Sequence, residues 1–142
     1  MNRKYSETFY SAHGEGPYVG IPSLWMRFFL CNLQCNGFGQ KDPTNPDTYE
    51  LPYQTIDIAD ITNVFDLPVF DKGCDSSYTW SKKYKHLITD KTVDEACNEL
   101  TAHLPHGKFI HPATGQEVHM VFTGGEPMIK QTQPGMMSIL DE

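Results

Sequence analysis

The stretch LWMRFFLCNLQC at residues 24–35 is a mainly apolar run followed by two cysteines. The stretch EVHMVFTGGEP at residues 117–127 is a second such run, followed by two glycines. The first run is apolar and aromatic apart from Arg27, and the second has the β-branched and aromatic residues typical of strands. Between them, Thr92 and Glu95 form the capping box of a helix whose apolar residues recur at helical spacing. The order strand, helix, strand predicts a parallel βαβ unit and therefore an α/β fold. The expected elements are strands at Leu24–Leu30 and Glu117–Phe122, a helix from Val93 to about Leu104, and a second helix from about Pro134 to the end of the chain.

The composition favours a folded domain without nucleic-acid or membrane binding. The 142 residues include 11 Lys and Arg against 18 Asp and Glu, a net charge of −7, and 39% are hydrophobic. This length predicts one domain, and the acidic balance argues against direct contact with nucleic acid or a membrane surface. No apolar run is long enough to be a membrane span, and the first residues do not resemble a signal peptide, so we expect a cytoplasmic protein. In that compartment, the four cysteines favour metal or catalytic roles over disulfides.

The middle of the chain differs from both flanks. Residues 37–73 contain seven acids, two lysines and four prolines. Their Asp-Pro and Asn-Pro steps are turn signals, while the stretch Ile56–Phe70 has enough apolar residues to pack. We therefore expect an ordered, acidic, proline-containing insertion at about residues 37–73.

The residues that are suited to binding a metal or another ligand follow the two core strands. Cys31 and Cys35 can bind one metal from a single loop, because thiolates are ligands of zinc and of iron–sulfur clusters. Gly124, Gly125 and Glu126 follow a parallel strand at the edge where α/β sheets bind ligands. Buried structural thiols and an ordinary strand-to-helix turn are the alternatives to these two interpretations.

Several motifs in a fixed order make the chain resemble radical S-adenosylmethionine (SAM) enzymes and, more narrowly, the 7-carboxy-7-deazaguanine synthases. They are TFYSA (8–12), HGEG (13–16), GIPS (20–23), Arg27, CNLQC (31–35), CDSSYTW (74–80) and GGEP (124–127). The resemblance implies a single radical SAM domain over residues 1–142 that is incomplete at its C-terminus. Its fold would be the N-terminal portion of a partial (β/α) radical SAM barrel, with parallel strands and covering helices. A full barrel of this kind takes about 250 residues.

The resemblance also implies roles for particular residues. Phe38 stands where the family has a cluster cysteine, so the insertion would separate the second cluster cysteine from the third. The implied roles are ligation of a 4Fe-4S cluster by Cys31, Cys35 and Cys74, binding of the amino group of S-adenosyl-L-methionine by Gly124, Gly125 and Glu126, binding of the substrate by His13, Glu15 and Arg27, and binding of magnesium by Ser76.

The activity implied by the resemblance is that of a lyase in deazapurine biosynthesis of the queuosine type. It would convert 6-carboxy-5,6,7,8-tetrahydropterin to 7-carboxy-7-deazaguanine with loss of ammonia. The expected partners are the pterin substrate, an electron donor such as flavodoxin, and a second copy of the chain in a homodimer.

Two alternatives remain open. Another radical SAM protein, such as a glycyl-radical-enzyme activase, needs the cysteines and GGEP but neither HGEG nor CDSSYTW. A zinc-binding interaction module would use Cys31 and Cys35 with a pair from Cys74, Cys97 or histidine.

Overall fold

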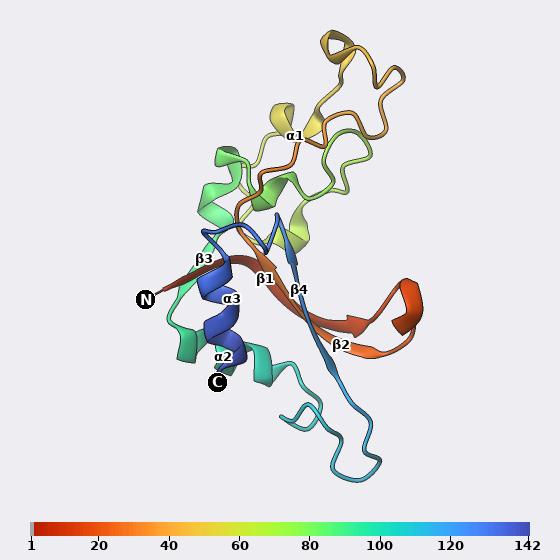
Figure 1. The fold of residues 1–142 in the computed structure, drawn as a ribbon. Helices are drawn as coiled ribbons and strands as arrows, with labels where there is room; N and C mark the ends of the chain where they lie inside the picture. Colours follow the sequence, from red (N-terminus) through yellow and green to blue (C-terminus); the bar gives the residue numbers. More distant parts are fainter. Residues whose placement is uncertain (1) are drawn as a thin grey trace.

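A four-stranded mixed sheet forms the core of the protein, as seen in a computed structural model that describes residues 2–142 (Figure 1). The strands lie in the order β3-β1-β2-β4. Strand β1 is antiparallel to both β2 and β3, while β2 is parallel to β4. The strands are β1 (Arg3–Ala12), β2 (Pro22–Phe28), β3 (Thr89–Lys91) and β4 (His119–Gly124).

The α/β class and the parallel pair of core strands agree with the sequence, whereas the sheet as a whole is mixed because β1 is antiparallel to both of its neighbours. The sequence does not predict β1, because two of its three buried residues, Ser6 and Thr8, are polar. A short hairpin joins β1 to β2, closed by hydrogen bonds between the backbones of His13 and Ile21 and of Gly20 and His13, each 2.9 Å long. Only antiparallel strands can be joined by so short a connection. The partial barrel therefore stays a prediction.

Two helices cover one face of the sheet. They are α2 (Val93–Ala102) and α3 (Gln133–Leu140), which lie side by side in Figure 1. The predicted capping box of α2 is confirmed, because Thr92 Oγ1 accepts the Glu95 N–H and the Glu95 carboxylate accepts the Thr92 N–H. The core under the helices contains the alternate β2 residues Leu24, Met26 and Phe28.

The other face of the sheet carries the intervening residues. Because side chains alternate along a strand, Trp25 and Arg27 point away from the helices. The strand register aligns them with Phe9 and Glu7 of β1 on one side and with Val121 and Thr123 of β4 on the other. This face is where a ligand can meet the sheet without displacing the helical layer.

The predicted insertion, residues 37–73, is an ordered segment whose two ends lie next to each other. The Gly73 N–H donates to the Phe38 carbonyl at 2.8 Å, and Gly73 has a φ of +79°, a conformation that favours glycine. Its apolar side chains form a second hydrophobic cluster with the segment that follows. The buried members of this cluster are Tyr53, Ile58, Phe70, Tyr84 and Leu87. The upper lobe of Figure 1 contains this insertion.

The insertion and the segment after it contain short helices. They are η2 (Pro46–Thr48), α1 (Pro52–Thr55), η3 (Val64–Asp66), η4 (Ser77–Thr79) and η5 (Lys82–Leu87), while η1 (Gly16–Tyr18) lies in the β1–β2 hairpin. Within residues 2–142, the longest apolar helix is too short to cross a membrane.

Glu99 of α2 ties the helix to two strands. Its carboxylate accepts hydrogen bonds from Tyr5 at 2.8 Å, from Thr8 at 2.6 Å and from Lys91. Partial burial alone would raise the pKa of Glu99, but these hydrogen bonds outweigh that effect and leave the pKa below its usual value.

We expect Glu99→Gln to lower the free energy of unfolding by about 1–2 kcal/mol near pH 7 and by less near pH 3. The pKa of Glu99 is lower in the folded state, so the carboxylate stabilises the protein above its unfolded-state pKa. That contribution is lost as the pH falls through the folded-state pKa. Urea denaturation at both pH values measures the difference, with Glu117→Gln, which changes a solvent-exposed carboxylate, as the control. A destabilisation that is equal at both pH values would contradict the prediction.

Candidate functional site

The cysteine loop and the GGEP segment meet at the carboxyl ends of two adjacent strands. Strands β2 and β4 are parallel, and their register ends with Phe28 beside Gly124. Beyond this pair, the Glu126 N–H donates to the Leu30 carbonyl at 2.9 Å. A Cβ atom on Gly125 would lie only 1.7 Å from the same carbonyl oxygen. GGEP therefore packs on the backbone immediately before Cys31, and only glycine permits this approach.

Thr79 holds both segments and was not among the predicted site residues. Its carbonyl accepts the Leu30 N–H at 2.7 Å, and its Oγ1 accepts the Gly125 N–H at 2.9 Å. Thr79 is fully buried, and Leu30 has a φ of +93°, which is unusual for a residue with a side chain. The only signal for Thr79 in the sequence is its position in the CDSSYTW motif, because a buried threonine looks like any other strand or core residue.

The three predicted cluster cysteines share one neighbourhood. Burial raises the pKa of Cys35, and the nearby groups of Cys74, Cys31 and Asp75 raise it further. The Cys31 Sγ accepts the Leu33 N–H at 3.3 Å, and the Cys74 Sγ accepts the Trp80 indole N–H at 3.4 Å. Within residues 2–142, no three side chains of the metal-binding types are arranged close enough to hold an ion. The three thiols are of the type that binds iron–sulfur clusters, but they are not gathered into one metal-binding group, so cluster ligation stays a prediction.

A cleft runs between the cysteine loop and the GGEP segment. It has a volume of about 830 Å³ and is lined on one side by Leu30–Leu33 and on the other by Glu126 and Met128–Gln131. Cys31 and Glu126 face the same cleft, so a thiol and a carboxyl group are available to one ligand. The Glu126 Oε1 also accepts the Met128 N–H at 2.9 Å, which holds the carboxylate at the cleft.

Arg27 lies at the centre of a partly buried polar cluster. Its Nε donates to the Glu7 Oε1 at 2.6 Å, and the two side chains are 19% and 8% exposed. Its Nη1 reaches the Ser76 Oγ at 3.5 Å and the Gly124 carbonyl at 3.4 Å. Arg27 therefore connects the predicted substrate, magnesium and cofactor residues. Glu7, its partner across the strands, was not predicted because the sequence gives no sign of β1.

Tyr78 completes this cluster and was also missed. Its hydroxyl donates to the Glu7 Oε1 at 2.9 Å, and the Arg27 guanidinium lies 5.9 Å from its ring centroid. Burial raises the pKa of Tyr78, and the Glu7 carboxylate adds to this against the opposing effect of Arg27. Tyr78 is therefore a neutral phenol that donates a hydrogen bond at physiological pH.

Ser76, the predicted magnesium residue, lies at the same cluster. Its hydroxyl donates to the Asp75 Oδ1 at 3.0 Å. A carboxylate and a hydroxyl oxygen are the ligand types that magnesium prefers. The pair supplies two oxygens, and magnesium binding stays a prediction.

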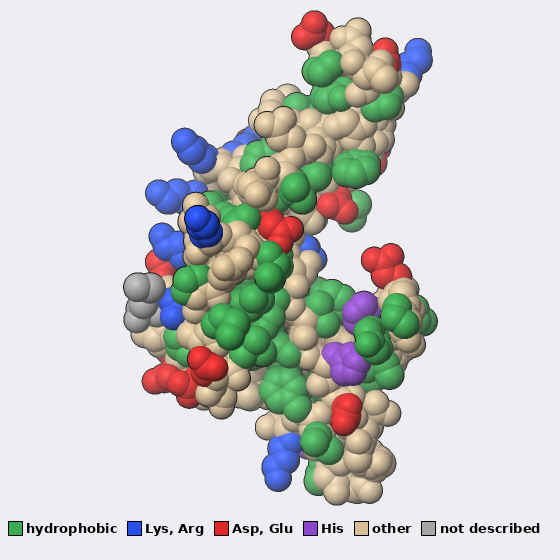
Figure 2. All heavy atoms as spheres, in the orientation of Figure 1, with side chains coloured by type: hydrophobic (Ala, Val, Ile, Leu, Met, Phe, Trp, Pro, Cys, Tyr) green, Lys and Arg blue, Asp and Glu red, His purple; other side chains and the backbone are tan. Residues whose placement is uncertain are grey.

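His13 and Glu15 lie at the hairpin between β1 and β2. A cavity of about 410 Å³ is lined by His13, Gly14 and Glu15 of the hairpin with Trp25 and Val121 of the sheet. His13 Nδ1 is 3.0 Å from the Glu15 carbonyl, and the Glu15 side chain is exposed. Figure 2 shows histidine side chains among apolar side chains at this end of the molecule. The two predicted substrate residues therefore border one cavity, and Arg27 lies on the same sheet face as Trp25.

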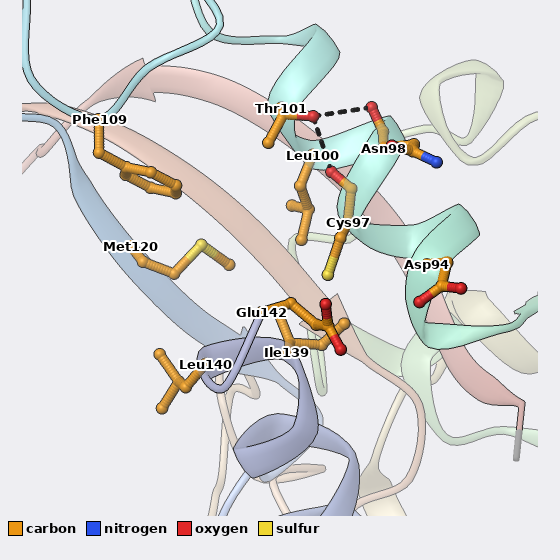
Figure 3. Close-up of a pocket in the computed structure, with 10 residues that line it drawn as sticks. All are labelled: Asp94, Cys97, Asn98, Leu100, Thr101, Phe109, Met120, Ile139, Leu140 and Glu142. Atoms are coloured by element: carbon orange, nitrogen blue, oxygen red, sulfur yellow. Dashed lines mark hydrogen bonds between the residues drawn. The ribbon is translucent and has the colours of Figure 1, made fainter.

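Cys97 lies apart from the other three cysteines. It packs against the helix-covered core and lines a separate cavity of about 580 Å³ between α2 and α3 (Figure 3). Burial raises the pKa of Cys97, and Glu142 and Asp94 raise it further. Cys97 therefore packs as a small, partly buried residue at the edge of the core.

We expect Gly125→Ala to lower the free energy of unfolding by about 1–3 kcal/mol, because the new methyl group meets the Leu30 backbone. Chemical denaturation measures this change. Gly14→Ala is the control, since its Cβ would enter open space, and we expect it to change stability by less than about 0.5 kcal/mol. Equal stabilities of the two variants would contradict the close contact of Gly125 with Leu30.

No family model matches the chain. Two curated proteins, both named 7-carboxy-7-deazaguanine synthase, share short segments with it. The protein from Bacteroides thetaiotaomicron is 50% identical over 36 residues, which are 25% of this chain and 20% of that protein. The protein from Thermoplasma acidophilum is 50% identical over 30 residues, which are 21% of this chain and 14% of that protein. The matched part of the chain thus spans a fifth or less of each relative, and it establishes a local similarity to these synthases.

Proposed function

We propose that the chain belongs to a radical SAM enzyme of the 7-carboxy-7-deazaguanine synthase type, which converts 6-carboxy-5,6,7,8-tetrahydropterin to 7-carboxy-7-deazaguanine with loss of ammonia. The observation that carries this proposal is the contact of the CNLQC loop with GGEP at the ends of adjacent parallel strands. The names of the two partly similar proteins support the choice of reaction. The proposal includes an external electron donor such as flavodoxin, and a homodimer.

The cofactor end of the proposed site consists of thiols and hydrogen-bond acceptors. Cys31, Cys35 and Cys74 would hold a 4Fe-4S cluster, and three thiolates leave one iron open to another ligand. When bound, the cluster and S-adenosyl-L-methionine supply a 5′-deoxyadenosyl radical. The N–H groups of Gly125 and Glu126 already donate to Thr79 and Leu30. The Gly125 carbonyl and the Glu126 carboxylate remain to accept hydrogen bonds from the amino group of the cofactor.

The substrate end of the proposed site is built around Arg27. Its Nε is held by Glu7, and its Nη1 already reaches Ser76 and the Gly124 carbonyl. A paired contact with the substrate carboxylate would use Nη2 together with Nη1. His13 and Glu15 border the neighbouring cavity and would bind the polar edge of the ring. Ser76, with Asp75 beside it, would supply oxygen ligands to magnesium near that carboxylate.

Metal analysis tests the proposal directly. We expect anaerobic reconstitution with iron and sulfide to give a brown protein, to fail for the most part in Cys74→Ala and to succeed in Cys97→Ala. The reason is that Cys74 shares the neighbourhood of the cysteine loop, whereas Cys97 packs in the helix-covered core. Iron and sulfide content and the visible absorption spectrum measure the result.

Other outcomes would overturn the proposal in different ways. A colourless protein with one tightly bound zinc would favour the interaction module. Loss of iron in Cys97→Ala with retention in Cys74→Ala would refute the ligand assignment. A brown protein that cleaves S-adenosyl-L-methionine but forms no deazaguanine would favour another radical SAM enzyme.

We expect Arg27→Lys to weaken binding of 6-carboxypterin about tenfold, because lysine cannot make the paired contact with a carboxylate. Lysine retains a positive charge beside Glu7, so the variant avoids leaving that carboxylate buried and unpaired. Isothermal titration calorimetry gives the dissociation constants. Pterin without the carboxylate is the control ligand, and an equal loss of affinity for both pterins would argue against a role of Arg27 in carboxylate binding.

A further inference from the structure

Trp25 presents a fixed aromatic surface on the open face of the sheet. Its ring stacks on Phe9 with centroids 5.7 Å apart and planes inclined by only 5°. Its indole N–H is directed to the Ser11 carbonyl at 3.4 Å. The His13 ring lies 5.2 Å from the same indole. The orientation of Trp25 is therefore set by the protein before any ligand arrives.

A cavity borders Trp25 between the hairpin and strand β4. Strand β2 lies between β1 and β4, and Trp25 is aligned with Phe9 on β1 and with Val121 on β4. The cavity of about 410 Å³ is lined by Trp25 and Val121 together with the hairpin residues 13–15, but not by Phe9. The indole therefore packs on Phe9 and also lines the cavity.

The walls of this cavity suit a flat, polar ligand. An indole and a valine side chain form apolar sides, and Glu15 supplies an exposed carboxylate that accepts hydrogen bonds. Tyr18 packs edge-on against His119 with ring centroids 5.2 Å apart, which adds two further aromatic rings near this end of the sheet. A fused pyrimidine ring presents a flat surface for stacking and N–H groups at its edge for a carboxylate.

We propose that Trp25 determines specificity for the pterin ring by stacking on it in the cavity bordered by His13 and Glu15. This inference rests on the proposed function for the identity of the ligand. Trp25 adds recognition of the ring itself to the recognition of the carboxylate by Arg27. The two side chains are two residues apart on β2 and therefore share one sheet face.

The test compares variants of Trp25 in binding 6-carboxypterin, an aromatic analogue with the ring and carboxylate of the proposed substrate. We expect Trp25→Leu to raise the dissociation constant about tenfold and Trp25→Phe to raise it less than about threefold, because phenylalanine keeps a flat ring. Isothermal titration calorimetry of the full chain measures binding without any need for a loaded cluster. Phe65→Leu, an exposed aromatic residue of the insertion, is the matched control. Circular dichroism verifies that each variant is folded.

The outcomes separate this inference from the proposed function. Binding of 6-carboxypterin by Trp25→Leu as tightly as by the wild type would overturn the role of Trp25 and leave the proposed function intact. Failure of the wild type to bind 6-carboxypterin would contradict both. Adenosine serves as a second probe, and if Trp25→Leu weakens adenosine binding but leaves pterin binding unchanged, the stacking surface belongs to a nucleoside and the inference is wrong.

Discussion

The close approach of Gly125 to the Leu30 carbonyl is the constraint on which the candidate site depends. Parallel strands β2 and β4 bring the two segments to the same edge, but their pairing ends at Phe28 and Gly124. Beyond that point the chains would normally separate. They stay together because residue 125 has no Cβ and because Thr79 accepts hydrogen bonds from the backbone N–H groups of both Leu30 and Gly125. The cysteine loop and the GGEP segment are therefore held at a fixed separation by backbone contacts, independently of any ligand.

Thr79 also explains how a long insertion can precede a residue of the site. Only four residues separate Thr79 from Cys74, so anchoring the threonine brings Cys74 close to the cysteine loop. The insertion closes on itself through the Phe38–Gly73 hydrogen bond and packs its own hydrophobic cluster. Since the entropy cost of closing a loop grows only with the logarithm of its length, the insertion adds only a small entropy cost to folding. Burial of its residues Tyr53, Ile58 and Phe70 offsets the cost of ordering it.

The sequence predicts the elements whose signals are local and misses those that depend on pairing. The capping box of Thr92 and Glu95 and the run before Gly124 predict α2 and β4 to within a few residues. Strand β1 is not predicted, because its buried positions are largely polar and its stability comes from pairing with β2 and β3. Motif resemblance identifies Arg27 and Ser76 as candidates, but their partners Glu7, Tyr78 and Thr79 follow only from three-dimensional contacts. Tyr78 and Thr79 lie in the CDSSYTW motif, but no local pattern in the sequence indicates what they or Glu7 contact.

The pairing of Arg27 with Glu7 affects what kind of anion the site can recognise. An arginine between Met26 and Phe28 must point away from the helix-covered core, and on that face it is only 19% exposed. An unpaired charge there would be costly, and the strand register supplies Glu7 as its partner. The pair has no net charge, so it attracts distant anions only weakly. Recognition must then come from directional hydrogen bonds at short range, from the terminal nitrogens of Arg27. Because the guanidinium presents its donors in one plane, such an arrangement suits an anion that can accept two hydrogen bonds at once.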